Sequence, residues 1–399
     1  MRAARSRTSA NLSRREFLDS VAAASCAAVL GVAREAWAGE ETSTGVATNV
    51  ADFLKVPRGP HAIPGPFPGR VVRIEDNRAL VAERFDAGVI RGMVEEGIRR
   101  LTGTDMKRSF ALFFAPDDIV GIKVNPVGAP LISTRVEVVD ALVRWLVDNG
   151  VRAKQIVIWD RFEAMLGDAG FTRAHFPGVG IEGLQMMDEN GDGWRDSSGR
   201  HRSEGNFDLA AAYVVPGVEG KGVRGYQDDV FYLNQHVFNG EASYFGALVT
   251  RRLTKIINVA AYKNTGHAIS MATKNLGYGA VCNTGRLHAP LGLAVNTEVL
   301  AAPWLRDKLV LNVTDGLRGQ FDGGPDQNAQ FVFPNRALYF ATDPFALDTV
   351  CHQELVAKRR AMGVTVDEHP RTTDYLRYGQ RLGLGVADPS RIRLLRVVA

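Results

Sequence analysis

The 399-residue sequence has few cysteines, no long apolar run and no large excess of charge of one sign. Its three cysteines form no C-x-x-C pair, so this chain supplies neither a tetracysteinyl iron–sulfur cluster nor a zinc ribbon. No segment reaches the roughly 18 apolar residues that indicate a transmembrane anchor. The net charge is +4, and Lys and Arg form no cluster after residue 38, so we expect no nucleic-acid binding. The composition of the whole sequence, 45% apolar and 23% charged residues, is typical of a folded globular protein.

The first 38 residues are predicted to form an export signal. Arg14 and Arg15 precede Phe17-Leu18, an Ala-rich apolar stretch covers 21–33, and Ala36-Trp37-Ala38 is an A-x-A cleavage pattern. The arginine pair resembles the twin-arginine (Tat) signal. This resemblance implies export by the Tat machinery, cleavage near Ala38 and a periplasmic or otherwise extracytoplasmic location. The Tat route carries folded proteins, so it leaves room for a metal ion or another cofactor inserted before export. An amphipathic surface helix is the alternative interpretation of these residues.

The remaining chain is expected to form one α/β domain, residues 70–399, after a Pro/Gly-rich extended lead-in at 39–69. Apolar runs at 119–124 and 156–159 flank a helical pattern that opens at a Thr134–Glu137 capping box and stops at Gly150. This is a strand–helix–strand unit with parallel strands. Further strands are predicted at 71–74, 255–260, 309–313, 337–341 and 392–398, with a loop-rich insertion at about 161–250. The fold class is therefore α/β, with a largely parallel (mixed) sheet flanked by helices.

Polar residues follow several of these predicted strands. Ligands of open α/β sheets usually bind at the carboxyl ends of the strands, so we expect these side chains to converge on one edge. They are Lys123, Asn125, Asp160, Lys263, His267, Lys274, Asn275, Gly277, Asp315 and Asp343.

The residue types in this set suggest three kinds of role. The candidate catalytic groups are Lys123, His267, Lys274 and Asp315. The candidate cofactor- or anion-binding residues are Asn125, Lys263, Asn275 and Gly277. The candidate metal ligands are Asp160, Asp315 and Asp343. A local structural role stays open for each: Asp343 before Pro344 fits a helix cap, Asp315-Gly316 fits a turn, and the lysines fit ordinary ion pairs.

Two further groups have alternative interpretations. Asp188, Asn190 and Asp192 match the first half of a D-x-N-x-D-G calcium loop, although its twelfth position is Gly199 instead of Glu. A hairpin tip built on Asn-Gly and Asp-Gly explains the same residues. Cys282 and Cys351, the cysteines left after cleavage, form either a disulfide or two buried free thiols.

Several short motifs occur in the order seen in the domain of unknown function 362 family. They are Asp118–Asn125, Lys274-Asn275-Leu276-Gly277, Asp315-Gly316 with Gly323-Gly324-Pro325, and Thr342–Asp348. The resemblance spans roughly residues 70–360 and implies which positions matter, but no reaction. The sequence as a whole favours an exported soluble protein. We expect it to be an enzyme that depends on a cofactor or metal, with its site at the strand ends and a small anionic substrate. The alternative is a non-catalytic extracytoplasmic ligand-binding protein.

Overall fold

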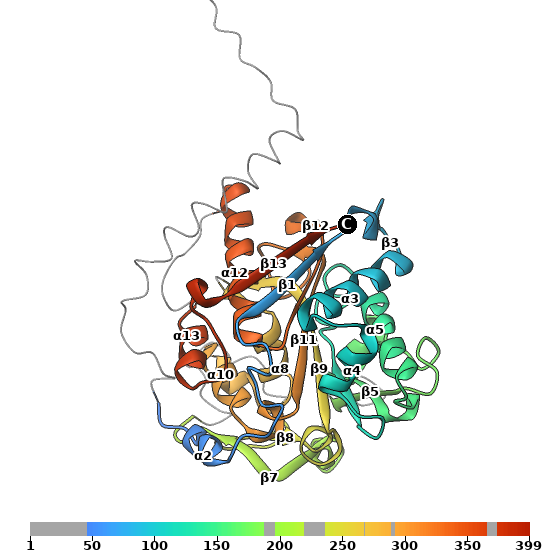
Figure 1. The fold of residues 1–399 in the computed structure, drawn as a ribbon. Coiled ribbons are helices and arrows are strands. Elements are labelled where there is room, and N and C mark those ends of the chain that lie inside the picture. Colours follow the sequence, from blue (N-terminus) through green and yellow to red (C-terminus); the bar gives the residue numbers. More distant parts are fainter. Residues whose placement is uncertain (1–45, 187–195, 219–235, 267, 289–291, 365–372) are drawn as a thin grey trace, which may run out of the picture. The chain divides into compact units, whose positions relative to one another are not determined.

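Most strands of the protein belong to one nine-stranded mixed sheet. The computed structural model describes residues 46–186, 196–218, 236–266, 268–288, 292–364 and 373–399, which belong to one compact unit, Glu41–Ala399. The strands lie in the order β13-β1-β12-β11-β9-β4-β5-β6, and β10 pairs with β9 (Figure 1). The predicted α/β class, with a largely parallel mixed sheet flanked by helices, is confirmed.

Five neighbouring strands run parallel and form the half of the sheet that matters for the site. They are β11 (Leu309–Gln320), β9 (Lys255–Thr265), β4 (Val120–Lys123), β5 (Ile156–Phe162) and β6 (Gly180–Gln185). β9 and β11 are longer than their apolar runs predict, so Lys263 and Asp315 lie inside strands and not after them. β6 comes from the 161–250 segment, whose polar sequence did not indicate a strand of the main sheet.

One strand is antiparallel to both of its neighbours, and this separates Asp343 from the other predicted site residues. β12 (Val332–Ala341) is antiparallel both to β11 and to β1 (Arg70–Glu75), while β13 (Arg393–Val398) pairs parallel with β1. The end of β12 therefore lies beside the beginning of β11, since Ala341 pairs with Asn312. The chain thus leaves β12 in the direction opposite to that in which it leaves β4 and β5. The end of β12 is level with Lys123, because Ala341, Asn312, Asn258 and Lys123 are successive register partners.

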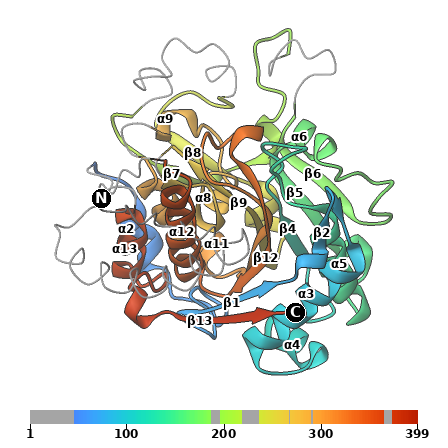
Figure 2. The same cartoon turned by 90° about the horizontal axis from the view of Figure 1, so that it is seen from above.

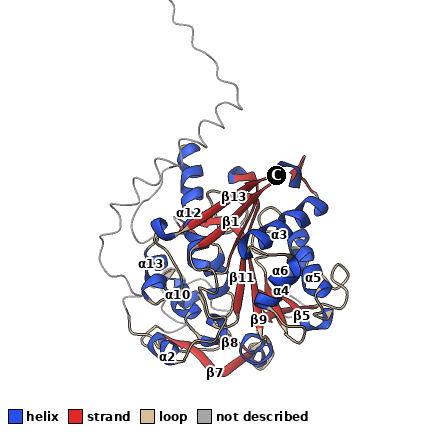
Figure 3. Cartoon of the chain, in the orientation of Figure 1, coloured by secondary structure: helices blue, strands red, loops and turns tan. Residues whose placement is uncertain are grey.

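Helices cover both faces of the sheet, as Figures 2 and 3 show. One apolar core lies under α3 (Ala87–Thr102), α4 (Met106–Phe113) and α5 (Val136–Asp148), and includes Ile257 and Val259 of β9. The other core lies under α8 (Ala272–Gly277), α10 (Ala294–Leu300), α12 (Pro344–Ala361) and α13 (Asp374–Arg381), and includes Ile256 and Ala260. This alternation follows from the two-residue repeat of a strand that is buried on both faces.

The remaining elements are short. They are α2 (Val50–Lys55), α6 (Glu163–Asp168), α9 (Gly285–His288), α11 (Pro303–Arg306), the paired strands β2 (Leu80–Val81) and β3 (Arg84–Phe85), the paired strands β7 (Phe207–Val214) and β8 (Ala242–Gly246), and β10 (Ala268–Ile269). Helix α2 lies in the lead-in that the sequence predicted to be extended, and its Phe53 packs edge-on against Phe245 and Trp304. No helix within the described ranges is long and apolar enough to cross a bilayer.

The predicted capping box at the start of α5 is wrong. The Thr134 hydroxyl accepts a hydrogen bond from the Asn125 amide and donates one to the Val259 carbonyl. It therefore makes no capping hydrogen bond to α5. The Asp315 carboxylate caps the helix instead, because it accepts a hydrogen bond of 2.8 Å from the Arg135 amide at the start of α5. A residue 180 positions away in sequence therefore caps α5, which local sequence reasoning does not detect.

Asp343 joins three segments at the sheet edge where β12 ends. Its carboxylate accepts hydrogen bonds from the amides of Phe345 and Ala346 in α12, of Gly69 at the end of the lead-in, and of Val386. All four bonds are buried, and burial raises the pKa of Asp343 to about 6 while the amide donors oppose this shift. Asp343 is therefore the N-cap residue of α12, as the helix-cap interpretation predicts.

We predict that Asp343→Ala lowers the free energy of unfolding by about 3 kcal/mol, because it leaves four buried amides without their acceptor. Asp86→Ala is the matched control, since Asp86 caps α3 through two exposed hydrogen bonds and its loss should cost about 1 kcal/mol. Urea denaturation measures both values. Equal losses for the two variants would contradict the role given to Asp343.

Candidate functional site

Lys123 is a buried ammonium whose hydrogen-bonding capacity is used up within the protein. It ends β4 and is 1% exposed, and its Nζ donates to Asp160 Oδ1 (2.5 Å), Val124 O (2.6 Å) and Asn275 Oδ1 (3.0 Å). An ammonium has three N–H donors, so none is left for a ligand. Burial lowers the pKa of Lys123, and the adjacent Asp160 carboxylate opposes this by favouring the charged form.

A chain of side-chain amides leads from Lys123 across the sheet. Asn275 Nδ2 donates to Asn258 Oδ1 (2.8 Å), Asn258 Nδ2 donates to Asn312 Oδ1 (3.0 Å), and Asn312 Nδ2 donates to the Thr342 carbonyl (3.3 Å). Asn258 is the Cα partner of both Lys123 and Asn312, so the row crosses β4, β9 and β11 at one level. We call Asp160, Lys123, Asn275, Asn258 and Asn312 the polar row.

Lys263 and Lys274 are the two cations near this row that lack a carboxylate contact among the residues the structure describes. Lys263 is fully buried, and its Nζ donates to Asn125 Oδ1 (3.3 Å) and Val127 O (2.5 Å). Lys274 is partly exposed, and its Nζ donates to Thr265 Oγ1 (3.3 Å) and lies 5.9 Å from the centre of the Tyr278 ring. Both ammonium groups thus keep N–H donors that no acceptor among the described residues uses.

The charge states of these two lysines are coupled. Burial, aided by the positive charges of Lys274 and Lys123, lowers the pKa of Lys263 to about 7. Burial also lowers the pKa of Lys274 to about 8, while the carboxylate of Asp326 partly opposes the shift in both. Perturbed values of this kind cluster at functional sites.

Two loops close around Lys263, and glycines allow their close approach. Gly324 follows β11, and its amide donates to Asn264 Oδ1 beside Lys263; a Cβ here would lie 2.3 Å from the Asn264 carbonyl oxygen. Gly128 follows β4 with φ +89°, and a Cβ here would lie 2.8 Å from the Ile132 carbonyl oxygen. The loop after β4 contacts the end of β9 through Val127, whose carbonyl accepts from Lys263, and the loop after β11 contacts it through Gly324.

The three aspartates predicted as metal ligands do not come together. Asp160 pairs with Lys123, and Asp315 accepts hydrogen bonds from the amides of Arg135 and Leu317. Asp343 accepts its four amide hydrogen bonds where the antiparallel β12 ends. Burial raises the pKa of Asp315 to about 6. Within the ranges that the structure describes, no three His, Cys, Asp or Glu side chains gather to hold a metal ion. The prediction of a three-aspartate metal site is therefore wrong.

The structure brings together Lys123, Asn125, Asp160, Lys263, Lys274 and Asn275 from the predicted set. Gly277 serves packing, since a Cβ there would lie 2.8 Å from Asn296 Cα. His267 and the calcium-loop residues Asp188, Asn190 and Asp192 lie outside the described residues. Cys282 and Cys351 are buried free thiols, which confirms that alternative over the disulfide.

The comparison with known families bears on this half of the sheet. Residues 238–353 match the family model described as "Domain of unknown function (DUF362)". The match is shorter than the predicted 70–360 and contains Lys263, Lys274 and Asn275, while Lys123 and Asp160 precede it. No curated protein and no solved structure gives a significant match to the chain.

Within the matched residues, Asp348 fixes the helix that carries Lys274 and Asn275. Its carboxylate accepts hydrogen bonds from the amides of Ala272 and Thr273 and from the Thr273 hydroxyl, at 2.6–2.9 Å. Both carboxylate oxygens of Asp348 are thus occupied by α8. The Asp348 of the Thr342–Asp348 motif therefore positions the first turn of α8.

Asn258 and Asn312 were missed by the sequence reasoning. Each stands alone in an apolar strand, in Ile256-Ile257-Asn258-Val259 and Leu311-Asn312-Val313. A buried amide in such a strand requires a hydrogen-bond partner, which is the signal that could have identified both. Gly279 was missed as well, and a Cβ at this position would lie 2.3 Å from Lys123 Cε.

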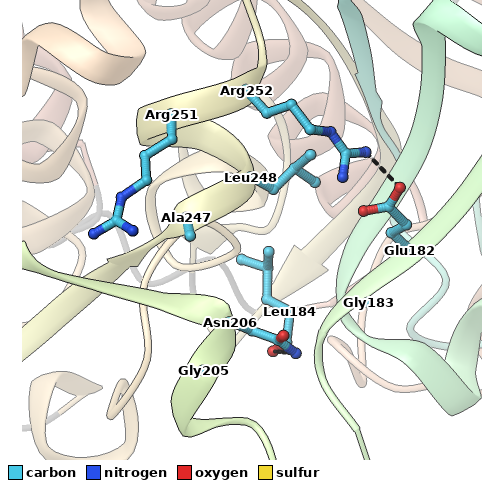
Figure 4. Close-up of a pocket in the computed structure, with 9 residues that line it drawn as sticks. All are labelled: Glu182, Gly183, Leu184, Gly205, Asn206, Ala247, Leu248, Arg251 and Arg252. Carbon is cyan, nitrogen blue, oxygen red and sulfur yellow. Dashed lines mark hydrogen bonds and ion pairs between the residues drawn. The ribbon is translucent and has the colours of Figure 1, made fainter.

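A separate pocket of about 380 Å³ opens beside β6 (Figure 4). Leu184, Ala247 and Leu248 line it, and an ion pair between Arg252 and Glu182 lies across it. None of the predicted site residues lines this pocket.

We predict that Lys274 reacts with acetic anhydride with a half-maximal rate near pH 8, because burial favours its neutral, nucleophilic form. Competitive acetylation read by mass spectrometry measures the rate at each pH. The same lysine in the urea-denatured chain is the control and should reach its half-maximal rate near the ordinary value of about 10.4. Coincident profiles for the folded and denatured chains would contradict the buried environment described for Lys274.

Proposed function

We propose that the protein binds a small anionic ligand through Lys263 and Lys274 at the carboxyl edge of the parallel strands. One observation carries the proposal: two neighbouring buried or partly buried ammonium groups have no carboxylate contact among the described residues, while the third, Lys123, is paired with Asp160. Like charges held together away from water are unfavourable unless an anion offsets them. The same charge pattern suits an anion and not a cation.

The donor count supports a ligand with several oxygen atoms. Toward the residues that the structure describes, Lys263 uses two of its three N–H donors and Lys274 uses one, so three donors remain for the ligand. Carboxylate, sulfate and phosphate groups accept several charge-assisted hydrogen bonds. The ligand class is therefore a small molecule that carries one of these groups.

A second candidate function, catalysis, is favoured by Lys263 specifically. A lysine with a pKa of about 7 exchanges a proton readily near neutral pH, as a general base requires. In this reaction Lys274 holds the anionic group of the substrate and Lys263 accepts a proton from it. Mass spectrometry of a co-purified small molecule, before and after incubation with the protein, distinguishes an enzyme, which changes the molecule, from a carrier, which does not.

The export of the protein belongs to the same proposal. The arginine pair, the short apolar stretch and the A-x-A pattern in the first 38 residues support a Tat signal. The mature protein then acts in the periplasm or another extracytoplasmic space.

We predict that the protein binds sulfate and that Lys274→Met weakens binding at least about tenfold, the loss expected for one charge-assisted hydrogen bond. Sulfate stays a dianion across the pH range of interest. Its affinity should fall as pH rises from 6 to 9, because Lys263 and then Lys274 lose their protons, with pKa values of about 7 and about 8. Isothermal titration calorimetry measures each affinity.

The control is Lys55→Met, since Lys55 is an exposed residue of α2 paired with Asp52. This variant should bind sulfate like the wild type. A Lys274→Met variant with wild-type affinity, or an affinity that rises with pH, would refute the lysine site.

We predict that replacing both Arg14 and Arg15 by Lys stops export and leaves the uncleaved precursor in the cytoplasm, because the Tat machinery requires the arginine pair. Cell fractionation measures the location, and mass spectrometry of the wild-type protein should find a mature chain that begins just after Ala38. Unchanged export of the double variant would show that another route carries the protein.

A further inference from the structure

The polar row is a complete hydrogen-bonded chain inside the sheet. Each of its three asparagines is at most 6% exposed, and each donates and accepts within the row or to a main-chain carbonyl. A buried polar group without a partner costs several kcal/mol, so a fully satisfied row is stable only while every member is present.

The direction of the row is fixed at both ends. Lys123 can only donate, so the Asn275 atom facing it is the oxygen, and the Asn275 amide NH₂ faces Asn258. At the far end, Asn312 faces the Thr342 carbonyl, which can only accept. Every amide therefore turns its oxygen toward the lysine side, and the aligned dipoles favour the charged ammonium of Lys123.

The row also fixes α8. Asn258 Nδ2 donates to the Ala272 carbonyl (2.9 Å) as well as to Asn312, and Asn275 is the neighbour of Lys274 in the same helix. Gly279, just after α8, packs against the Lys123 side chain so closely that no Cβ fits between them. Asp348 holds the first turn of α8, and these contacts, which end on Lys123, hold the turn that carries Lys274.

We propose that Lys123 is a positioning residue of the anion site: the polar row holds its ammonium as a fixed charge and through Asn275 aligns α8 so that Lys274 faces the ligand. This inference rests on the proposed anion binding. It separates Lys123, whose three donors are occupied, from Lys263 and Lys274, which contact the ligand.

The variant Asn258→Leu tests the inference, since it breaks the row at its centre and leaves all three lysines in place. Asn283→Leu is the control for losing a buried amide outside the row, and the positive φ of Asn283 (+56°) makes it the more costly of the two exchanges. Asn283 is also fully buried and hydrogen-bonded, to the Val237 amide and the Ala242 carbonyl, but it lies outside the row. Both exchanges remove a buried amide, so both should lower the melting temperature.

Only Asn258→Leu should change the site. We expect its sulfate affinity to fall at least about fivefold, and the half-maximal acetylation of Lys274 to move upward by at least about half a pH unit as the helix loosens. Asn283→Leu should keep the wild-type affinity and acetylation profile. Wild-type affinity and an unchanged acetylation profile in Asn258→Leu would overturn the inference and leave the row a purely structural feature.

Failure of sulfate binding and failure of the positioning role give different results. If the wild type itself does not bind sulfate, the proposed function fails, and the acetylation profiles of Asn258→Leu and Asn283→Leu still decide whether the row positions Lys274. If Asn258→Leu does not fold, the double variant Lys123→Met/Asp160→Asn carries the same test. It removes both members of the buried ion pair. No lone buried charge is left, and such a charge would be strongly destabilising.

Discussion

A charged ammonium in the interior of an apolar sheet has to be fully hydrogen-bonded, and the central part of this protein is arranged around that requirement. Lys123 is buried at the end of β4, and its three donors reach a carboxylate on β5, a carbonyl of its own loop and an amide on α8. The amide on α8 is supported in turn by asparagines of β9 and β11. Strand order, helix position and side-chain choice therefore depend on one another through this single buried charge.

The reversal of β12 decides which polar residues share the site. Five parallel strands bring Lys123, Asp160 and Lys263 toward their carboxyl ends. The chain leaves β12 in the opposite direction, and Asp343 joins α12, the lead-in and the segment at Val386. At the carboxyl edge of the parallel strands, Lys263 and Lys274 form no ion pair among the described residues, although the exposed carboxylate of Asp326 raises the pKa of both. Such an edge attracts anions, and the apolar surroundings that lower the pKa of Lys263 and Lys274 also strengthen their attraction to a bound anion.

Apolar periodicity predicted the fold class and the positions of most strands, because buried parallel strands are continuous apolar runs. The rule that polar residues gather at strand ends also predicted the grouping of Lys123, Asn125, Asp160, Lys263, Lys274 and Asn275. The sequence could not indicate the direction of β12, which depends on pairing between distant segments, and so Asp343 was misplaced. Nor could it indicate that Asp315 caps α5 from 180 residues away, or that Asn258 and Asn312 align in register.

The central claim is that an anion binds where Lys263 and Lys274 approach each other, and a heavy-atom crystal soak tests it most directly. Selenate has the shape and charge of sulfate, and its selenium scatters anomalously. The account predicts an anomalous peak within hydrogen-bonding distance of both Lys263 Nζ and Lys274 Nζ, and the loss of that peak in Lys274→Met crystals. Selenate bound only elsewhere, or a peak at this position that persists in the variant, would contradict it.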